Sequence, residues 1–276
     1  MNDIKIIACD LDGTLLHGDK TISQYTIDTL RNCAERGIHV VPATGRFYNG
    51  IPESLRKLPF IRYAITINGS AVLDVLENKT IYEATISSHS AVPILEYFND
   101  LGVAYNFYSL NAGFMEKRFI DHIEDHLDSK VFQTTVRQLY TPVDDLISFM
   151  ISEFDSIYKF QVFTKEPSKL RAASDFVNGL GLPLVVTSSF VYNLEVNSID
   201  ATKGKALNSL SEHLGVDIRD TAAFGDGGND INMLEAAGYG IAMENARTPV
   251  KQIADFITLS NDKDGVASWI NNNILK

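Results

Sequence analysis

The hydrophobic residues of this chain follow an α/β pattern from its start to about residue 86. Ile4–Cys9 is a continuous apolar run, which is typical of a strand that is covered on both faces. Ser23 can cap a following helix, and Gly37 can end it. The same pattern predicts strand Ile38–Val41, a helix near 47–58, strand Tyr63–Ile67 and two short strands around Ala71–Leu73 and Thr80–Tyr82. This alternation indicates the beginning of a doubly wound sheet.

The pattern changes between about residues 87 and 193. It predicts helices near 89–101, 116–128, 142–151 and 167–179, and strands at Val103–Tyr108, Val131–Leu139, Ile157–Phe163, 183–187 and 190–196. We interpret this section as an antiparallel sheet with helices on one face. It would be an α+β module inserted into the α/β domain.

The α/β pattern resumes at residue 203. It predicts a helix that ends at Gly215, strand Thr221–Phe224, helix Asn229–Ala237, strands Tyr239–Met243 and Asp255–Thr258, and a last helix over 264–274. The sequence therefore predicts two domains, a core of residues 1–86 and 194–276 and an inserted α/β domain of residues 87–193. A length of 276 residues agrees with this division, because single cores rarely grow much beyond ~250 residues.

Composition limits the classes of partner. The chain has 35 acidic and 24 basic residues, which gives a net charge of −11. This excess argues against a nucleic-acid partner or an anionic membrane, because no basic face could easily form. No basic segment with an apolar stretch opens the chain, and no run reaches the ~18 apolar residues of a membrane span. We therefore expect a cytoplasmic protein, in which Cys9 has a buried apolar role.

Two acidic residues follow the first predicted strand at a spacing of two, in the segment Asp10-Leu11-Asp12-Gly13-Thr14. Side chains alternate between the faces of a strand, so Asp10 and Asp12 leave the backbone on the same side. Core packing gives no reason for two such neighbours, because like charges repel. Either a hard cation lies between them, or one carboxylate attacks a substrate while the other moves a proton.

Two further segments have the chemistry of a phosphate site. Thr44, Gly45 and Arg46 follow the second predicted strand, where a hydroxyl group and free backbone amides suit an anion. Lys203 lies in the first turn of a predicted helix capped by Thr202, where the helix dipole disfavours a cation. A nearby anion would resolve that conflict.

A glycine-rich acidic segment, Gly225-Asp226-Gly227-Gly228-Asn229-Asp230, follows strand Thr221–Phe224. Helix capping explains Asn229 or Asp230 alone, but it does not explain Asp226 as well. Acidic residues on such a loop again suggest Mg²⁺, which is bound by few carboxylates and retains several waters. Ligands of open α/β sheets lie at the carboxyl ends of the strands, so all four segments are expected to converge there.

The order of these motifs resembles that of the haloacid dehalogenase (HAD) superfamily, and more narrowly its Cof-like branch with a type IIB cap. The resemblance rests on Asp-x-Asp-Gly-Thr, Thr-Gly-Arg, Lys-Gly and Gly-Asp-x-x-Asn-Asp, supported by Ile67-Asn68-Gly69-Ser70 and Asp264-Gly265-Val266-Ala267. It spans the whole chain. It implies a doubly wound, Rossmann-like core that carries an inserted α+β cap domain.

The resemblance also implies roles for the motif residues. Asp10 would attack phosphorus and become an aspartyl phosphate, while Asp12 would protonate the leaving alcohol and then activate water. Mg²⁺ would be held by Asp10, the backbone carbonyl of Asp12 and Asp226, with Asp230 beside these direct ligands. The phosphoryl oxygens would be bound by Thr44, Lys203, Asn229 and the backbone amides of Leu11 and Gly45. Arg46 would either pair with a carboxylate at the domain junction or contact the substrate.

The expected activity is Mg²⁺-dependent hydrolysis of small phosphorylated metabolites, such as sugar phosphates, by a monomer or small homo-oligomer. Two alternatives remain open from the sequence. One is a phosphomutase of hexose phosphates on the same core, and the other is a receiver-like phospho-acceptor switch. The switch is disfavoured by the chain length, by the ~100-residue insert and by Asp12 two residues after the acceptor.

The inserted domain would act as a lid that excludes water and contacts the leaving alcohol. Five residues surround a candidate loop for that contact, although packing or surface roles are equally compatible with each: Asn106, Tyr108, Asn111, Met115 and Arg118.

Overall fold

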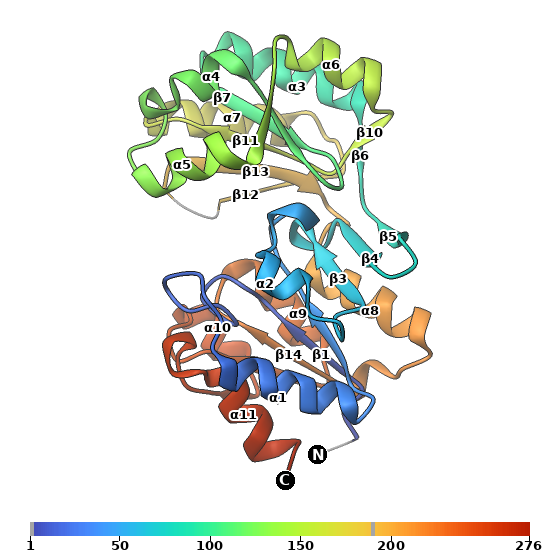
Figure 1. The fold of residues 1–276 in the computed structure, drawn as a ribbon. Helices are drawn as coiled ribbons and strands as arrows, with labels where there is room; N and C mark the ends of the chain where they lie inside the picture. The colour runs from blue at the N-terminus through green and yellow to red at the C-terminus, as the bar shows by residue number, and fades with distance from the viewer. Residues whose placement is uncertain (1–2, 189–190) are drawn as a thin grey trace. The chain divides into compact units, whose positions relative to one another are not determined.

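The computed structural model describes residues 3–188 and 191–276, which fold into two compact units (Figure 1). The core unit consists of Met1–Arg46, Ile51–Glu83 and Ala201–Lys276, and the inserted unit of Phe47–Gly50 and Ala84–Asp200. The assignment of residues 1–86 and 194–276 to a catalytic domain, and of 87–193 to a cap, stays a prediction.

A five-stranded parallel sheet forms the centre of the core unit. Its strands lie in the order β16 (Phe256–Ile257), β15 (Tyr239–Ala242), β14 (Thr221–Gly225), β1 (Ile6–Cys9) and β2 (His39–Pro42). Every residue of β1 is buried, as its unbroken apolar run predicts. The order places β1 and β14 side by side although 212 positions separate Cys9 from Thr221 in the sequence, which confirms the predicted doubly wound α/β core.

Helices cover this sheet, and their ends follow the predicted caps. They are α1 (Gln24–Glu35), α8 (Lys203–Leu214), α9 (Ile231–Ala236), α10 (Thr248–Ile253) and α11 (Gly265–Asn273). The side chain of Ser23 accepts a hydrogen bond from the Thr26 backbone at the start of α1, and Gly215 ends α8 in a left-handed conformation. These contacts confirm both predicted helix boundaries.

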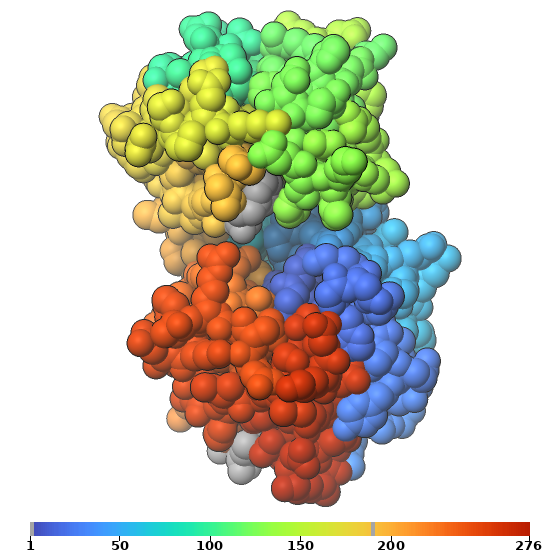
Figure 2. All heavy atoms as spheres, turned by 90° about the vertical axis from the view of Figure 1, so that its left-hand side faces the viewer, coloured from blue at the N-terminus to red at the C-terminus, as the bar shows by residue number. Residues whose placement is uncertain are grey.

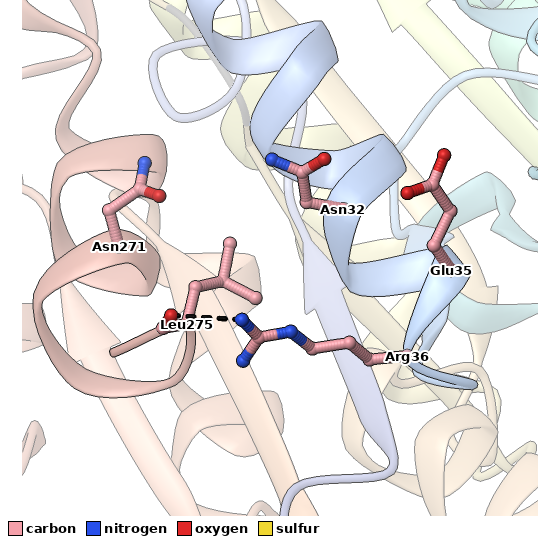
Figure 3. A pocket seen from close by; sticks show the side chains of 5 residues that line it. All are labelled: Asn32, Glu35, Arg36, Asn271 and Leu275. Carbon is pink, nitrogen blue, oxygen red and sulfur yellow. Dashed lines mark hydrogen bonds between the residues drawn. The ribbon is translucent and has the colours of Figure 1, made fainter.

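The two ends of the described core unit lie together. Figure 2 shows the blue amino-terminal and red carboxyl-terminal segments side by side on the surface of this unit, where α1 packs against α11. Arg36, just after α1, donates a hydrogen bond of 3.0 Å to the carbonyl of Leu275 (Figure 3). This contact attaches the last turn of the chain to α1.

A three-stranded antiparallel sheet of β3 (Tyr63–Thr66), β4 (Ala71–Asp74) and β5 (Lys79–Glu83) completes the core unit. The helix expected near 47–58 is wrong in extent. The structure instead has a 3₁₀ turn at Tyr48–Gly50 and a short α2 (Glu53–Arg56). Pro52 separates them, since the residue before a proline is disfavoured in a helical conformation.

The inserted unit contains a six-stranded sheet in the order β12 (Leu184–Thr187), β13 (Asn193–Ser198), β11 (Lys159–Phe163), β7 (Ala104–Tyr108), β8 (Gly113–Glu116) and β9 (Tyr140–Val143). All neighbours are antiparallel except β8 and β9. Helices α3 (Ser88–Asp100), α6 (Leu146–Glu153) and α7 (Pro167–Gly179) lie on one side of it (Figure 1). Short β6 (Ile86–Ser87) and β10 (Ser156–Ile157) pair with each other, and residue 190 of the last predicted strand lies outside the described residues.

The predicted strand Val131–Leu139 is wrong, because this segment is helix α5 (Lys130–Leu139). Its threonines suggested a strand, but the hydroxyls of Thr134 and Thr135 donate to carbonyls four residues earlier in the helix. Ser129 caps its first turn. The helix expected over 116–128 is also shorter, since α4 (Lys117–Asp121) and a 3₁₀ turn are separated at His122.

We predict that Gly204→Ala destabilises the protein, although alanine normally stabilises a helix relative to glycine. A Cβ at Gly204 would lie 2.3 Å from the backbone oxygen of Asn232, so α8 and α9 could not keep their present contact. We expect the free energy of unfolding in urea to fall by about 1–3 kcal/mol. Gly179→Ala is the control, because nothing lies within 4 Å of its added Cβ, and a gain of about 0.5–1 kcal/mol is expected. A stabilised Gly204→Ala protein would contradict this packing.

Candidate active site

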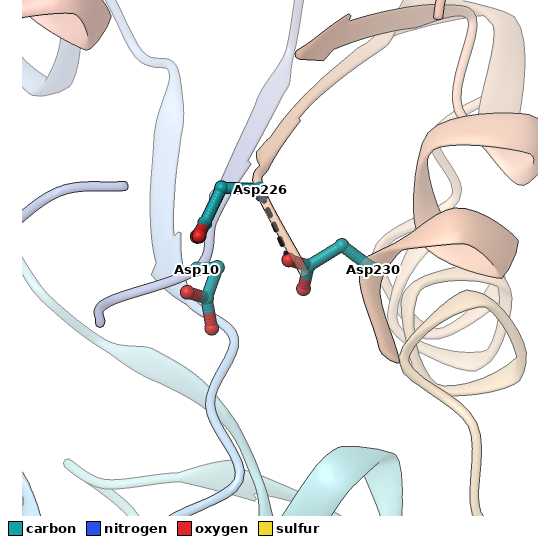
Figure 4. A group of neighbouring side chains, drawn as sticks. All are labelled: Asp10, Asp226 and Asp230. Carbon is teal, nitrogen blue, oxygen red and sulfur yellow. Dashed lines mark hydrogen bonds between the residues drawn. The ribbon is translucent and has the colours of Figure 1, made fainter. Parts of the chain in front are cut away.

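Three carboxylates meet at the carboxyl ends of the central strands. Asp10 follows β1 and Asp226 follows β14, and these strands are neighbours. Asp230 belongs to the 3₁₀ turn Gly228–Asp230, just before α9. One oxygen of each carboxylate lies within 4.8 Å of the others, and Figure 4 shows the three side chains converging. The structure thus brings together residues that are far apart in the sequence.

The ammonium group of Lys203 lies between two of these carboxylates. Its Nζ atom donates to Oδ1 of Asp10 and to Oδ1 of Asp230, each at 2.6 Å. The lysine side chain is fully buried at the start of α8. The anion that the helix dipole led us to expect near Lys203 is therefore present as a pair of carboxylates.

Asp230 also fixes the loop that carries Asp226. Its Oδ2 atom accepts hydrogen bonds from the backbone amides of Asp226, at 3.0 Å, and Gly227, at 2.8 Å. One carboxylate thus holds Lys203 with one oxygen and the loop with the other. Asp226 has a further contact of its own, because Thr14 donates its hydroxyl hydrogen to Oδ1 of Asp226 at 2.8 Å.

Burial, with the charges of neighbouring groups, shifts the pKa values of this cluster. Burial raises the pKa of Asp10, and the charges of Asp230 and Asp226 add to the rise against the opposing effect of Lys203. Burial likewise raises the pKa of Asp226 to about 6, with the Thr14 hydrogen bond opposing and the Asp230 charge adding. Burial lowers the pKa of Lys203, but Asp10 and Asp230 outweigh it and raise that pKa above its usual value.

The cluster fits a divalent cation. Three carboxylates face one buried ammonium group, so a further positive charge would relieve their repulsion. The three acidic side chains offer carboxylate oxygens, which are the ligands that hard cations such as Mg²⁺ prefer.

Asp12 lies outside this group of three, in an ion pair of its own. Arg46 donates from Nε to Oδ2 at 2.8 Å and from Nη2 to Oδ1 at 2.7 Å, and Lys20 donates to Oδ1 at 2.8 Å. Burial raises the pKa of Asp12, but the hydrogen bonds and charges of Arg46 and Lys20 outweigh it and lower the pKa to about 2. Arg46 thus pairs with a carboxylate, which is one of the two roles considered for it, and contact with the substrate stays a prediction.

The remaining predicted phosphate-binding residues lie around the same strand ends. Leu11 directly follows Asp10, and Thr44 and Gly45 follow β2. The hydroxyl oxygen of the buried Thr44 accepts a hydrogen bond from the Arg46 backbone at 3.2 Å. Asn229, in the turn before α9, donates from its side-chain amide to Oδ1 of Asn68 at 3.2 Å.

Three residues that contact the predicted site were not expected there from the sequence. Thr14 was part of the first motif but received no role, and Asn68 was interpreted only as part of a supporting motif. Lys20 gave no sequence signal, because its contact with Asp12 depends on a turn in which Lys20 has a positive φ of 68°.

The five residues expected around one loop of the inserted unit lie in different elements. Asn106 and Tyr108 belong to strand β7 and Met115 to β8, and all three are buried. Arg118 pairs with Glu116 and donates to Asn99 at 2.7 Å. Asn111 lies in the connection between β7 and β8, where its carbonyl accepts a hydrogen bond from Asn49 at 3.1 Å.

Within residues 3–188 and 191–276, no helix has both the length and the apolar character that crossing a membrane requires.

We predict that Lys203→Met lowers the free energy of unfolding by about 3–5 kcal/mol, because it leaves two buried carboxylates without their cation. The measurement is urea unfolding at pH 7 with EDTA present. Lys205→Met is the matched control two residues along the same helix, where the lysine is exposed, and a change within about 0.5 kcal/mol is expected. Equal stabilities of the two variants would show that the Lys203 ion pairs do not hold the cluster together.

Several known proteins are similar to this chain in both sequence and fold. A family profile described as haloacid dehalogenase-like hydrolase matches residues 7–270. The phosphatase YwpJ of Bacillus subtilis is 32% identical, over 96% of this chain and 98% of its own. The 5-amino-6-(5-phospho-D-ribitylamino)uracil phosphatase YcsE of the same organism is 30% identical, over 99% and 97%. A solved haloacid dehalogenase-like hydrolase from B. subtilis superposes with a TM-score of 0.83 at 30% identity, covering 98% of this chain and 100% of that one.

Proposed function

Since the chain belongs to the haloacid dehalogenase-like hydrolase family and is a phosphoric monoester hydrolase, we propose that it uses Mg²⁺ and an aspartyl phosphate on Asp10. The observation that carries this proposal is the cluster of Asp10, Asp226 and Asp230, in which Lys203 donates to Asp10 and to Asp230. A carboxylate nucleophile divides hydrolysis of the ester into two easier steps. The proposed activity releases free phosphate, which distinguishes it from a phosphomutase.

The carboxylates of Asp10 and Asp226 and the backbone carbonyl of Asp12 would hold Mg²⁺, with Asp230 next to them. Bound there, the ion supplies positive charge that offsets the charge of the phosphoryl oxygens. Lys203 supplies a second positive charge, and Mg²⁺ and Lys203 together would favour the ionised form of Asp10 against the effect of its burial. Thr44, Asn229 and the backbone amides of Leu11 and Gly45 would bind and align the phosphoryl group.

In the first step, a carboxylate oxygen of Asp10 bonds to phosphorus as the bond from phosphorus to the alcohol oxygen breaks. That oxygen takes a proton from Asp12 and leaves as the alcohol. In the second step, Asp12 accepts a proton from water, whose oxygen attacks phosphorus. The bond to Asp10 breaks, and inorganic phosphate and the free carboxylate result.

The contacts of Asp12 impose an order on these events. Both of its carboxylate oxygens accept hydrogen bonds from Arg46 or Lys20 in the structure. Asp12 must therefore separate from these cations before either oxygen reaches the leaving group. It must also take up a proton from solvent before the first step, because Arg46 and Lys20 hold its pKa at about 2 while the ion pair lasts. Arg46 and Lys20 would hold the side chain in a resting position until substrate is bound.

The proposed substrates are small phosphorylated metabolites, sugar phosphates among them. Support comes from relatives that cover nearly the whole chain and are named as phosphatases, including YcsE. We assign catalysis to residues 1–86 and 194–276 and propose that residues 87–193 act as a cap, which would exclude water and contact the alcohol part of the substrate.

We predict that Asp10→Asn lowers kcat for a chromogenic phosphate ester at least ~10³-fold, because the nucleophile is lost.

Asp12→Asn should instead accumulate acid-stable phosphate on the protein after a brief reaction, since its second step lacks a base. Wild-type activity should disappear with EDTA and return with Mg²⁺.

Asp19→Asn is the control for the Asp10 and Asp12 variants, because Asp19 is an exposed aspartate whose carboxylate contacts only Thr21 among the described hydrogen bonds. It should keep the wild-type rate within about twofold. Turnover by Asp10→Asn at the wild-type rate would remove the proposed mechanism.

A further inference from the structure

The turn that follows β3 has a strained backbone. Ile67 and Asn68, in the 3₁₀ turn Ile67–Gly69, have positive φ angles of 52° and 58°. A β-branched residue such as isoleucine rarely adopts this left-handed conformation, and Ile67 is also fully buried. Such strain persists only where the surrounding structure fixes it, and it is concentrated at functional sites. One contact that fixes the turn is a hydrogen bond of 2.9 Å from the Ile67 backbone amide to the carbonyl of Arg46.

The turn lies against two segments that we expect to bind phosphate. The backbone amide of Asn68 donates to the carbonyl of Thr44, just after β2, at 3.0 Å. Gly69 packs on the start of α8, since a Cβ on this glycine would lie 2.2 Å from the carbonyl carbon of Thr202. Thr202 directly precedes Lys203, so the turn and the buried lysine have a fixed relative position.

The side chain of Asn68 reaches a third such segment. Its Oδ1 atom accepts a hydrogen bond of 3.2 Å from Nδ2 of Asn229. Gly45 makes room for this atom, because a Cβ on Gly45 would lie 2.7 Å from it. Asn229 is exposed, and an exposed side chain changes its rotamer rapidly unless a contact holds it. Within the described residues, the hydrogen bond to Asn68 is the contact that holds the Asn229 amide.

We propose that Asn68 is a positioning residue for phosphoryl transfer, which acts by aiming the side-chain amide of Asn229 at the phosphoryl group. An amide nitrogen has two hydrogens, so the bond to Asn68 takes one and fixes the direction of the other. A donor that is already aligned needs no reorganisation during the reaction. This inference rests on the proposed function and adds a residue that acts without touching the substrate. All the residues in its argument belong to the core unit.

The test replaces Asn68 with glycine, which removes the side chain but adopts a left-handed backbone easily. We expect Asn68→Gly to lower kcat/KM for a chromogenic phosphate ester about tenfold, because the Asn229 amide is no longer aligned. Asn78→Gly is the matched control. Asn78 is an exposed asparagine that also has a positive φ, of 49°, in the turn between β4 and β5. It should keep the wild-type kcat/KM within about twofold.

A double variant separates positioning from a merely structural role. In an Asn229→Ala background the amide on which Asn68 acts is gone, so Asn68→Gly should change kcat/KM less than about twofold. A general disturbance of the fold would instead cause the same tenfold loss in both backgrounds, and that result would overturn the inference. Wild-type kcat/KM in either Asn68→Gly or Asn229→Ala would overturn it too. Asn68→Ala gives the same comparisons if Asn68→Gly does not fold.

Calorimetric binding of inorganic phosphate, with Mg²⁺ present, gives a readout that does not depend on turnover. The affinity should fall about fivefold in Asn68→Gly and in Asn229→Ala, which is about the contribution of one hydrogen bond, and no further in the double variant. Unchanged affinity in Asn68→Gly would contradict the inference. Failure of the proposed function would instead appear as full activity of Asp10→Asn.

Discussion

The acidic side chains at the carboxyl ends of the central strands depend on one contact, the pairing of the Lys203 ammonium group with two of them. This group is buried, and it donates to Asp10 and Asp230 at equal distances of 2.6 Å. Ion pairs of this kind are stable only when their geometry is good, because both partners have lost their hydration. The pairing lets a strand end and a loop that are far apart in the sequence present carboxylates to the same point. Asp226 forms no ion pair within the part of the chain that the structure describes, and a divalent ion would neutralise this excess negative charge.

The fold prepares this arrangement through local features of the chain. Parallel strands β1 and β14 end at the same edge, so residues that directly follow them are neighbours. Helix α8 begins at Lys203, so the lysine lies at that edge. Asp230 holds the loop between β14 and α9, because its carboxylate accepts hydrogen bonds from two backbone amides of that loop. Asp12 takes part in a separate ion pair with Arg46 and Lys20. The same edge therefore contains a fixed group of charges and one acidic side chain, Asp12, whose proposed role requires it to move.

Local signals explain what could be predicted from the sequence. The buried strand β1, the cap of α1 at Ser23 and the acidic residues after β1 and β14 all follow from short patterns of residues. The segment Val131–Leu139 could not be assigned by its β-branched residues, because hydrogen bonds within the helix satisfied its threonine hydroxyls. The contact of Lys20 with Asp12 depends on a turn geometry that no short pattern encodes.

One face of the six-stranded sheet in the inserted unit carries buried polar residues, and the sequence did not predict this face. It depends on the register of β7, β11 and β13, which places Asn106, Gln161 and Glu195 in one row although 89 positions separate the first from the last. The sequence suggested Asn106 and Tyr108 only as residues near a loop. Strand pairing between distant segments is set by packing of the whole unit, and no local pattern reports it.

The carboxylates around Lys203 form, on this interpretation, a site for one divalent cation, and isothermal titration of the metal-free protein with Mg²⁺ tests this most directly. We expect one ion per chain and an affinity at least ~10-fold lower in Asp226→Asn. The affinity should be unchanged in Asp217→Asn, where the altered carboxylate pairs with Arg219 on the surface. Binding of Mg²⁺ by Asp226→Asn as tightly as by the wild type would contradict the proposed site.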